Sequence, residues 1–258
     1  ADALHVPRGG AGVRGVGREV LEVDPPRVYM FRWNQDVLRF ELIPDGDGCR
    51  LVFTQTISGG RVGRLGAGRT AAGWDACLDS LAAQLAGEAA APVEDWLARM
   101  ERYIAEFGLG EGEVRLVDNG FELHFARDLV WTPVGTVWAL LVEDSPLEAE
   151  PPVRATNEHV PAGRLTRVEA PRVLEYEWLH EGTPAGRVCW TIESEPELSV
   201  RVELTQSVPA ELAGLRAAAL AAWHVHLELF FAAVQGDVRC PWPRDRVEEL
   251  TKHYDSTL

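Results

Sequence analysis

The sequence predicts an α+β protein of two similar domains, each a curved antiparallel sheet wrapped around a long C-terminal helix. Three pairs of similar segments support this prediction. Residues 17–33, GREVLEVDPPRVYMFRW, reappear as GRLTRVEAPRVLEYEW at 163–178, and RLVFTQTI at 50–57 reappears as RVELTQSV at 201–208. AAGWDACLDSLAAQLAG at 71–87 returns as LAAWHVHLELFFAAVQG at 220–236. A repeat of this length indicates a duplicated domain rather than a solenoid.

We expect the first domain at residues 1–110 and the second at 111–258. About fifteen residues precede the repeated segments in the first copy, whereas about fifty do so in the second. The opening strand and helix of the second copy therefore have no counterpart in the first. Either the sequence begins inside a longer chain, or the first domain is truncated and borrows a strand. A missing strand would leave an open sheet edge, which favours a homodimer.

The second copy contains every expected element. Alternating apolar residues and turn signals predict strands over 120–130, 153–160, 163–169, 174–178, 186–193 and 199–207. The segment ESEPE (193–197) is expected to be a hairpin turn, and residues 108–118 a junction between the domains. An apolar helix is predicted to begin near Pro133 and to be followed by a Pro- and Glu-rich loop at 145–152.

A long helix is predicted from about 210 to 235, with a short amphipathic helix in the tail after it. The apolar stripe of the long helix contains Leu220, Trp223, Leu227, Phe230, Phe231 and Val234. An antiparallel sheet with one apolar face must cover that face, and only this helix is large enough to do so. The first copy repeats the pattern with a helix that carries Trp74, Leu78, Leu81 and Leu85.

Composition narrows the classes of partner and compartment. A net charge of -15 argues against nucleic acid or an anionic membrane as the main partner. No apolar run approaches the roughly 18 residues of a membrane span. The four cysteines are widely spaced and form no CxxC pair, which favours reduced thiols in a cytoplasmic protein over a disulfide.

The repeated segments resemble the bacterial AHSA1-like branch of the START/SRPBCC (Bet v 1-like) superfamily, named after the C-terminal domain of an activator of the Hsp90 ATPase. GREVLEVDPPRVYMFRW, DGDGCRLVFTQ and AAGWDACLDSLAAQL carry the resemblance in the first copy. LTRVEAPRVLEYEW, SVRVELTQ and LAAWHVHLELFFAAV carry it in the second. The resemblance covers nearly the whole chain outside residues 1–14 and the junction. It implies a helix-grip fold in both domains.

The helix-grip fold implies a cavity between the sheet and the long helix, and a largely apolar cavity suits a hydrophobic small molecule. In the second copy we expect this cavity to be lined by Tyr176, Trp178, Trp190, Leu204, Gln206, Trp223, His226, Leu227 and Phe230. In the first copy the corresponding residues are Trp33, Phe40, Phe53, Gln55, Trp74 and Leu78. For each tryptophan, ordinary core packing is the alternative to stacking on an aromatic ligand.

His226 is the one candidate catalytic residue. It lies one turn from Trp223 and could enter the cavity as a general acid/base or ligand donor, or it could be a boundary histidine bonded to backbone or water. His224 and Glu228 are expected to form a solvated pair. Since a metal site needs three or more converging ligands, and His224 and His226 face different sides of a helix, no metal or cofactor is predicted. Gln55 and Gln206, at equivalent inward positions, could orient a ligand or satisfy buried backbone.

These features lead to three hypotheses of function. The first is binding of a hydrophobic, lipid- or polyketide-like small molecule without a reaction. The second is a polyketide cyclase/dehydratase-like enzyme in which His226 or Gln206 moves protons. The third is a protein-interaction module similar to the Hsp90-activating domain. The fold alone does not choose among them.

Overall fold

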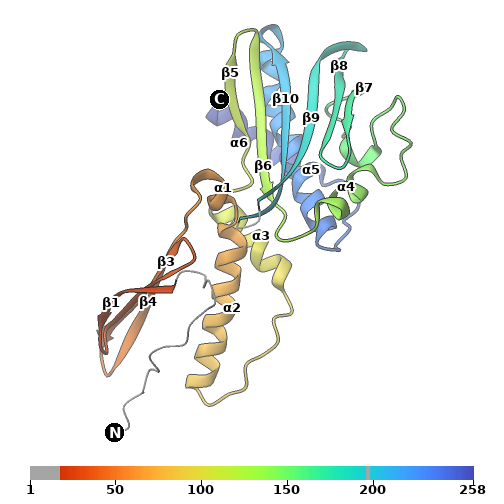
Figure 1. The fold of residues 1–258 in the computed structure, drawn as a ribbon. Coiled ribbons are helices and arrows are strands. Elements are labelled where there is room, and N and C mark those ends of the chain that lie inside the picture. Colours follow the sequence, from red (N-terminus) through yellow and green to blue (C-terminus); the bar gives the residue numbers. More distant parts are fainter. Residues whose placement is uncertain (1–17, 196–197) are drawn as a thin grey trace. The chain divides into compact units, whose positions relative to one another are not determined.

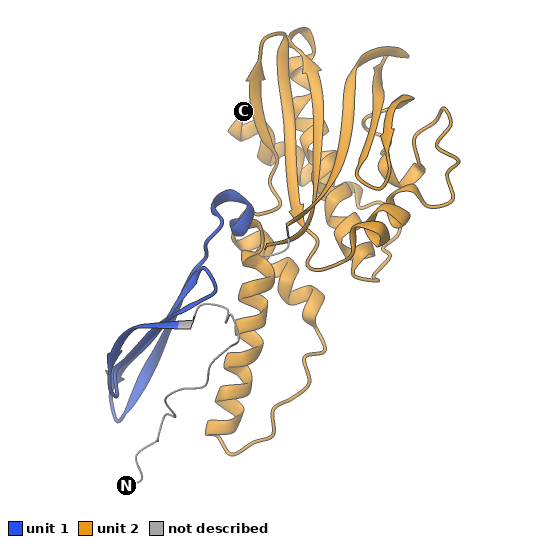
Figure 2. Cartoon of the chain, viewed as in Figure 1, with its two compact units in different colours: residues 1–64 blue, residues 65–258 orange. Residues whose placement is uncertain are grey.

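A computed structural model describes residues 18–195 and 198–258 (Figure 1). Residues 1–17 and part of the expected turn at 193–197 lie outside the described residues. The chain divides into two compact units, residues 1–64 and residues 65–258 (Figure 2). Each unit is described by itself.

Unit 1 is built on a four-stranded antiparallel sheet in the order β1-β2-β3-β4. The strands are β1 (Arg18–Asp24), β2 (Val28–Trp33), β3 (Asp36–Asp45) and β4 (Gly48–Thr56), and α1 (Gly60–Leu65) follows at the unit boundary. Aromatic rings pack across the sheet: the centroids of Phe40 and Phe53 lie 4.8 Å apart, and those of Phe31 and Phe40 lie 6.4 Å apart. Alternation along the strands places these rings on one face.

Unit 2 contains a six-stranded antiparallel sheet in the order β5-β6-β10-β9-β8-β7. Its strands are β5 (Glu113–Val117), β6 (Gly120–Asp128), β7 (Ala162–Glu169), β8 (Val173–His180), β9 (Thr183–Glu195) and β10 (Ser199–Pro209). Its helices are α2 (Ala67–Leu85), α3 (Trp96–Glu106), α4 (Val134–Val142), η1 (Val153–Ala155), η2 (Ala210–Leu215), α5 (Arg216–Val234) and α6 (Arg244–Thr257). Together the two units form an α+β protein, which confirms the predicted fold class.

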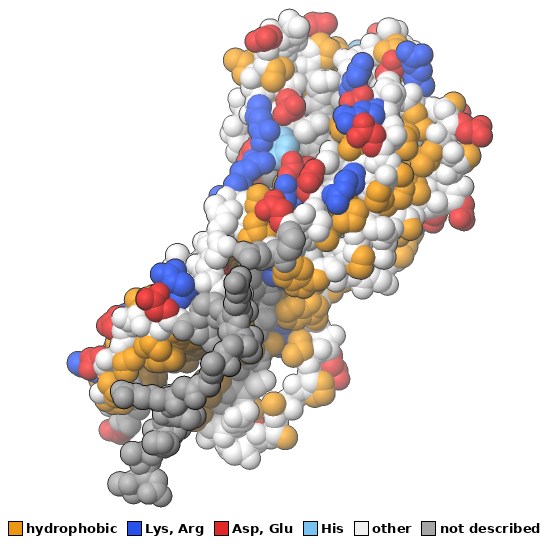
Figure 3. Space-filling view, viewed as in Figure 1, with side chains coloured by type: hydrophobic (Ala, Val, Ile, Leu, Met, Phe, Trp, Pro, Cys, Tyr) orange, Lys and Arg blue, Asp and Glu red, His pale blue; other side chains and the backbone are white. Residues whose placement is uncertain are grey.

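The two faces of the unit 2 sheet differ in chemistry. On the face toward α5, Phe125, Leu204, Trp190 and Leu174 occupy paired positions on four adjacent strands and are fully buried. The outward positions between them carry ion pairs: Arg187 with Glu175, Arg164 with Glu177, and Arg201 with both Glu195 and Glu203. Basic and acidic side chains are accordingly interspersed on the outward face of the sheet (Figure 3). The alternation predicted for the strands of the second copy is confirmed.

Burial of α5 is more complete than the predicted stripe. Thirteen of its 19 residues are buried, because α6 and the segment that links α4 to β7 cover sides that the sheet does not reach. By length and composition, Ala210–Val234 is long and apolar enough to cross a membrane, yet 72% of its most apolar window is buried inside the protein. The same apolar composition is required of a helix that is enclosed on most sides.

The two sheets share details of register that support the duplication in part. The equivalent pairs are Leu38/Gln55 and Val188/Gln206, then Phe40/Phe53 and Trp190/Leu204. The hairpin turns are also equivalent, with bonds from Arg27 N to Asp24 O (2.7 Å) and from Arg172 N to Glu169 O (2.8 Å). Within the described part of unit 1, β4 pairs only with β3, whereas its counterpart β10 pairs with both β9 and β6. Among the described residues of unit 1, no strand corresponds to β6, and the missing opening strand of the first copy stays a prediction.

The compact units do not follow the predicted boundary between residues 110 and 111. Helices α2 and α3, which the sequence assigns to the first domain, cluster with unit 2. Ion pairs contribute to this: Arg69 on α2 bonds Asp128 on β6, and Glu101 on α3 bonds Arg239. The boundary of the duplicated sequence unit at 110/111 stays a prediction, because a helix can pack on a neighbouring sheet without changing its origin.

Two local predictions are wrong. Residues 153–160 form no strand, because η1 begins at Val153 and only an isolated bridge joins Asn157 to Val160. The junction at 108–118 contains β5, which extends the sheet by pairing with β6. Its five residues are too few for a clear alternating pattern, and four of them are exposed.

Burial in this sheet predicts unequal costs for the same substitution. Leu204→Ala on β10 should lower the free energy of unfolding by about 2–5 kcal/mol, because the side chain is fully buried and its removal leaves a cavity. Leu116→Ala on β5 is the matched control: this leucine is 81% exposed, so the loss should stay within about 0.5 kcal/mol. Urea denaturation measures both values, and equal losses would contradict the described packing.

Candidate functional site

Aromatic side chains from β9 and α5 fill the space where the sequence predicts a ligand cavity. The rings of Trp190 and Trp223 meet edge to face, with centroids 6.0 Å apart, and Phe230 lies 5.5 Å from Trp190. Such tilted contacts are favourable beyond the area that they bury. We refer to these three side chains as the aromatic layer. It is buried, as expected for its residues.

The polar atoms next to the aromatic layer are mostly satisfied within unit 2. Trp223 Nε1 donates to Gln206 Oε1 at 2.6 Å, so Gln206 holds the indole in place. Trp178 Nε1 donates to the carbonyl of Ser207 at 2.7 Å. Gly186 permits this approach, since a Cβ there would lie 2.5 Å from Trp178 Nε1. Of the predicted lining residues, Gln206 and Trp178 therefore have structural partners.

The short helix η1 lies over the aromatic layer and is tied to it by main-chain carbonyls. The Ala155 carbonyl accepts from Tyr176 Oη at 2.7 Å and from Trp190 Nε1 at 3.1 Å. The Arg154 carbonyl accepts from His226 at 2.9 Å. Burial raises the pKa of Tyr176 well above its ordinary value, so this hydroxyl remains a donor at physiological pH. Three side chains of the interior thus anchor the segment 153–155.

His226 is neutral and present in one defined tautomer. Its Nε2 faces a carbonyl, which can only accept, so Nε2 carries the proton and Nδ1 presents a lone pair. Burial lowers the pKa of His226 to about 4. An imidazole with this pKa is a weak base at neutral pH, and it is better suited to accepting a hydrogen bond than to removing a proton.

Four buried polar atoms, on α5 and on the segments at 153–157 and 240–243, have no hydrogen-bond partner among the described residues. They are His226 Nδ1, Trp242 Nε1, Arg154 Nε and Asn157 Nδ2. The ring centroids of His226 and Trp242 lie 6.0 Å apart. The side-chain Oδ1 of Asn157 already accepts hydrogen bonds from the main-chain N–H groups of residues 159 and 160. We call these four residues the polar cap. Unpaired buried polar atoms are rare and point to a water or ligand that completes them.

Three of the four residues in the polar cap were not predicted from the sequence to belong to a site. Arg154 and Asn157 belong to the segment predicted as a strand, and Trp242 lies in the tail sequence CPWP. The tryptophan between two prolines is the one available signal, because a large aromatic side chain in a loop needs a surface to cover.

His224 faces the other side of α5 and corrects the prediction of a solvated pair. It is buried, its Nδ1 lies 2.8 Å from Tyr254 Oη, and its Nε2 lies 3.3 Å from Glu228. Burial lowers the pKa of His224. Burial alone would raise the pKa of Glu228, but hydrogen bonds from His224 and Arg246 bring it down to about 2. His224 is buried and Glu228 is part-buried, and α6 covers this side of α5.

The residues predicted to line a first cavity are divided between the units. In unit 1, Phe40 and Phe53 pack together, Trp33 is 43% exposed, and Gln55 donates to Asp36 at 2.6 Å. Trp74 and Leu78 lie on α2, in unit 2. A cavity in the first copy therefore stays a prediction.

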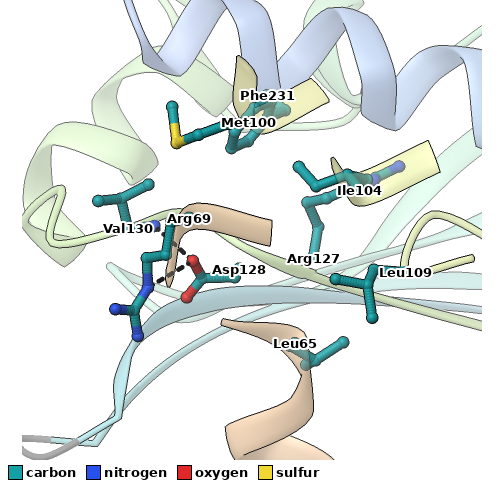
Figure 4. Close-up of a pocket in the computed structure, with 9 residues that line it drawn as sticks. All are labelled: Leu65, Arg69, Met100, Ile104, Leu109, Arg127, Asp128, Val130 and Phe231. Atoms are coloured by element: carbon teal, nitrogen blue, oxygen red, sulfur yellow. Dashed lines mark hydrogen bonds and ion pairs between the residues drawn. The ribbon is translucent and has the colours of Figure 1, made fainter. Parts of the chain in front are cut away.

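Two hollows in unit 2 lie away from the aromatic layer. One is a cavity of about 10 Å³ between α3, β6 and α5, lined by Leu65, Arg69, Met100, Ile104, Leu109, Arg127, Asp128, Val130 and Phe231 (Figure 4). The other is open to solvent beside the β5–β6 turn and η2. Within the described part of the chain, no group of three or more His, Cys, Asp or Glu residues could hold a metal ion. The four cysteines are free thiols.

Unit 2 thus has the architecture of a helix-grip domain, with a curved antiparallel sheet around one long helix. Residues 5–86, most of the first copy, match the family described as activator of Hsp90 ATPase homolog 1-like protein. This match confirms the AHSA1 resemblance for that segment. No protein in the curated collection matches the chain.

Several solved structures have a similar arrangement at low identity. CalU16 from Micromonospora echinospora is 17% identical over 57% of this chain and 96% of that one, with a TM-score of 0.41. EF2215 from Enterococcus faecalis, a conserved protein of unknown function, is 15% identical over 57% and 89%, with a TM-score of 0.43. DynU16, a protein of the dynemicin biosynthetic locus, is 17% identical over 84% and 79%, with a TM-score of 0.33.

The low pKa of His226 predicts a pH-dependent stability. Between about pH 6.5 and 4 the unfolded chain binds a proton that the folded chain does not, so the free energy of unfolding falls as the pH falls. The loss approaches about 1.4 kcal/mol per pH unit, or about 3 kcal/mol across the window. His226→Gln keeps a donor near the Arg154 carbonyl but cannot titrate, and it should remove this part of the pH dependence.

The control for this measurement is His253→Gln, which changes an exposed histidine on α6. Urea denaturation between pH 4 and 7.5 gives the difference between each variant and the parent protein. A pH dependence that is identical in His226→Gln and the parent would contradict the assigned burial of His226.

Proposed function

We propose that unit 2 binds a hydrophobic small molecule, lipid- or polyketide-like, at the aromatic layer, with a polar group of the ligand held by the polar cap. The observation that carries this proposal is the set of four unpaired buried polar atoms beside three aromatic rings. Ligand sites commonly combine an apolar wall with a few convergent polar groups. Here the wall is supplied by β9 and α5, and the polar groups by His226 on α5 and by the segments that contain Arg154, Asn157 and Trp242.

The chemistry of the polar cap indicates which polar group the ligand carries. His226 Nδ1 is an acceptor, while Trp242 Nε1, Arg154 Nε and Asn157 Nδ2 are donors. A hydroxyl can donate to the first, and a carbonyl or carboxylate can accept from the others. A ligand with neighbouring hydroxyl and carbonyl groups on an apolar body, such as a phenolic ketone, pairs with both kinds of atom.

Access requires the segment 153–155 to move, because the interior is filled by side chains. Opening breaks the three bonds to the carbonyls of Arg154 and Ala155. At about 1 kcal/mol each, the bonds cost about 3 kcal/mol, which weakens apparent binding roughly 100-fold. Burial of an aromatic body of 100–200 Å² offsets this cost at about 25 cal/mol per Å².

Binding is favoured over catalysis by the electrostatics of His226. With a pKa of about 4, it is protonated in only about one molecule in a thousand at pH 7, and it is a weak base when neutral. The proposal therefore uses this histidine as a hydrogen-bond acceptor. A cytoplasmic location and a homodimer remain predictions from the sequence.

The proposal is tested with 1,8-dihydroxyanthraquinone and palmitate as probes, by the shift in melting temperature and by quenching of tryptophan fluorescence. The anthraquinone should bind the full chain and raise its melting temperature with the logarithm of ligand concentration once the concentration exceeds Kd. Trp242→Phe keeps the ring and removes the donor, and His226→Gln removes the Nδ1 acceptor. Each should weaken binding about 5- to 30-fold, as expected for one buried hydrogen bond.

The matched control is Trp131→Phe, since Trp131 is 56% exposed and lies outside the aromatic layer and polar cap. Its affinity should equal that of the parent protein. If neither probe binds, or if Trp242→Phe and His226→Gln bind as well as Trp131→Phe, the proposed site is wrong.

A further inference from the structure

A second buried polar feature lies on the opposite side of α5 and is independent of the proposed ligand site. Arg127 on β6 follows Leu123 and Phe125 at the inward positions of the strand, and it is only 3% exposed. Its Nε and Nη2 atoms are buried and have no hydrogen-bond acceptor among the described residues. A buried guanidinium ordinarily pairs with a carboxylate or several carbonyls.

The two unpaired atoms form one edge of the guanidinium, which is the edge that grips planar anions. Other arginines of unit 2 show how it is used. Arg164 directs Nε and Nη2 to the two oxygens of Glu177, at 3.2 and 3.3 Å. Arg69 directs the same two atoms to Asp128 and to the Leu198 carbonyl, at 2.9 and 2.5 Å.

Each acidic group near Arg127 is already neutralised by another cation. Glu228 pairs with Arg246 at 3.0 Å, and Glu101 takes both Nη atoms of Arg239 at 2.7 and 3.1 Å. Asp128 pairs with Arg69 and also bonds Ser199. The charge of Arg127 is therefore left without a matching anion, and burial lowers its pKa.

The main chain at Gly110 packs directly against the guanidinium. Gly110 approaches so closely that a Cβ would lie 2.9 Å from Arg127 Nη1 and 3.0 Å from Nη2 and from His224 Nε2. Arg127 also lines the cavity of about 10 Å³, together with Arg69 and Asp128 (Figure 4). A cavity of this size holds about one water-sized species. It is too small for phosphate or for the hydrophobic ligand proposed at the aromatic layer.

We propose that Arg127 is the anchor of an internal site for a small monovalent anion, chloride or formate-like carboxylate, between β6, α3 and α5. The anion completes the Nε/Nη2 edge and neutralises a buried cation that no carboxylate pairs among the described residues. An isolated buried charge is costly, so the bound anion stabilises the packing of α3 on the sheet. The anion site is independent of the proposed ligand site and shares no residue with the aromatic layer or the polar cap.

The experiment compares melting temperatures of the full chain in sodium chloride, sodium formate and sodium gluconate at constant ionic strength. Chloride or formate should raise the melting temperature along a saturating curve, whereas gluconate, which is too large for the cavity, should not. Arg127→Met should lose this response, and in gluconate it should melt no lower than the parent protein because the unpaired buried charge is gone.

Two further variants keep the test decisive. Arg127→Lys retains a charge without the planar edge, so half-saturation by formate should shift more than tenfold. Arg201→Met removes an outward arginine paired with two glutamates, and it should keep the parent response to both anions. Broadening of the chloride-35 NMR signal by the parent protein but not by Arg127→Met reports binding directly.

The proposal is overturned if the parent protein melts at the same temperature in all three salts, or if Arg127→Met retains the response. His226→Gln and Trp242→Phe should both keep the anion response, so failure of the hydrophobic-ligand proposal leaves this result unchanged. Conversely, loss of the anion response in Arg127→Met says nothing about binding at the aromatic layer.

Discussion

The structure of unit 2 depends on the enclosure of α5. A helix with 13 of 19 residues buried cannot rest on a sheet alone, because a sheet covers only one side of it. The segment after α4 and the helix α6 must therefore close over the remaining sides. Once they do, every polar atom on the helix has to find a partner inside the protein, and the two histidines show how this requirement is met.

His226 and His224 solve the requirement differently on opposite sides of the helix. His226 reaches a main-chain carbonyl of η1 and leaves its other nitrogen unpaired among the described residues, as is one side-chain nitrogen of each other polar-cap residue. His224 is fully engaged between Tyr254 and Glu228. The incomplete side is thus where a ligand can contribute hydrogen bonds. On the complete side, the unsatisfied group is the neighbouring Arg127, whose chemistry calls for an anion instead.

The duplication is expressed in the two sheets through matching register and turns, but the helices depart from it. Unit 2 carries the polar cap on α5 and on loops and short helices, and the buried arginine on β6; unit 1 shows no equivalent of either within its described residues. The ordered rows of side chains across the sheet, from Phe125 to Leu174, form a scaffold that tolerates these differences. Function in such folds is carried by sites added to a common frame.

The sequence by itself determined the α+β class, five strands of the second copy (β6 to β10) and the inward set of Tyr176, Trp190, Leu204 and Trp223, because alternation and helical periodicity are local properties of the chain. Arg127 was not predicted as a buried charge, although it follows Leu123 and Phe125 at the alternate, inward positions of the same strand. Only the tertiary structure decided that His224 is buried, that the Arg154 carbonyl bonds His226, and that the Trp242 ring lies 6.0 Å from His226. Those outcomes depend on how irregular segments fold back over α5, and such long-range contacts leave no periodic signal in a single sequence.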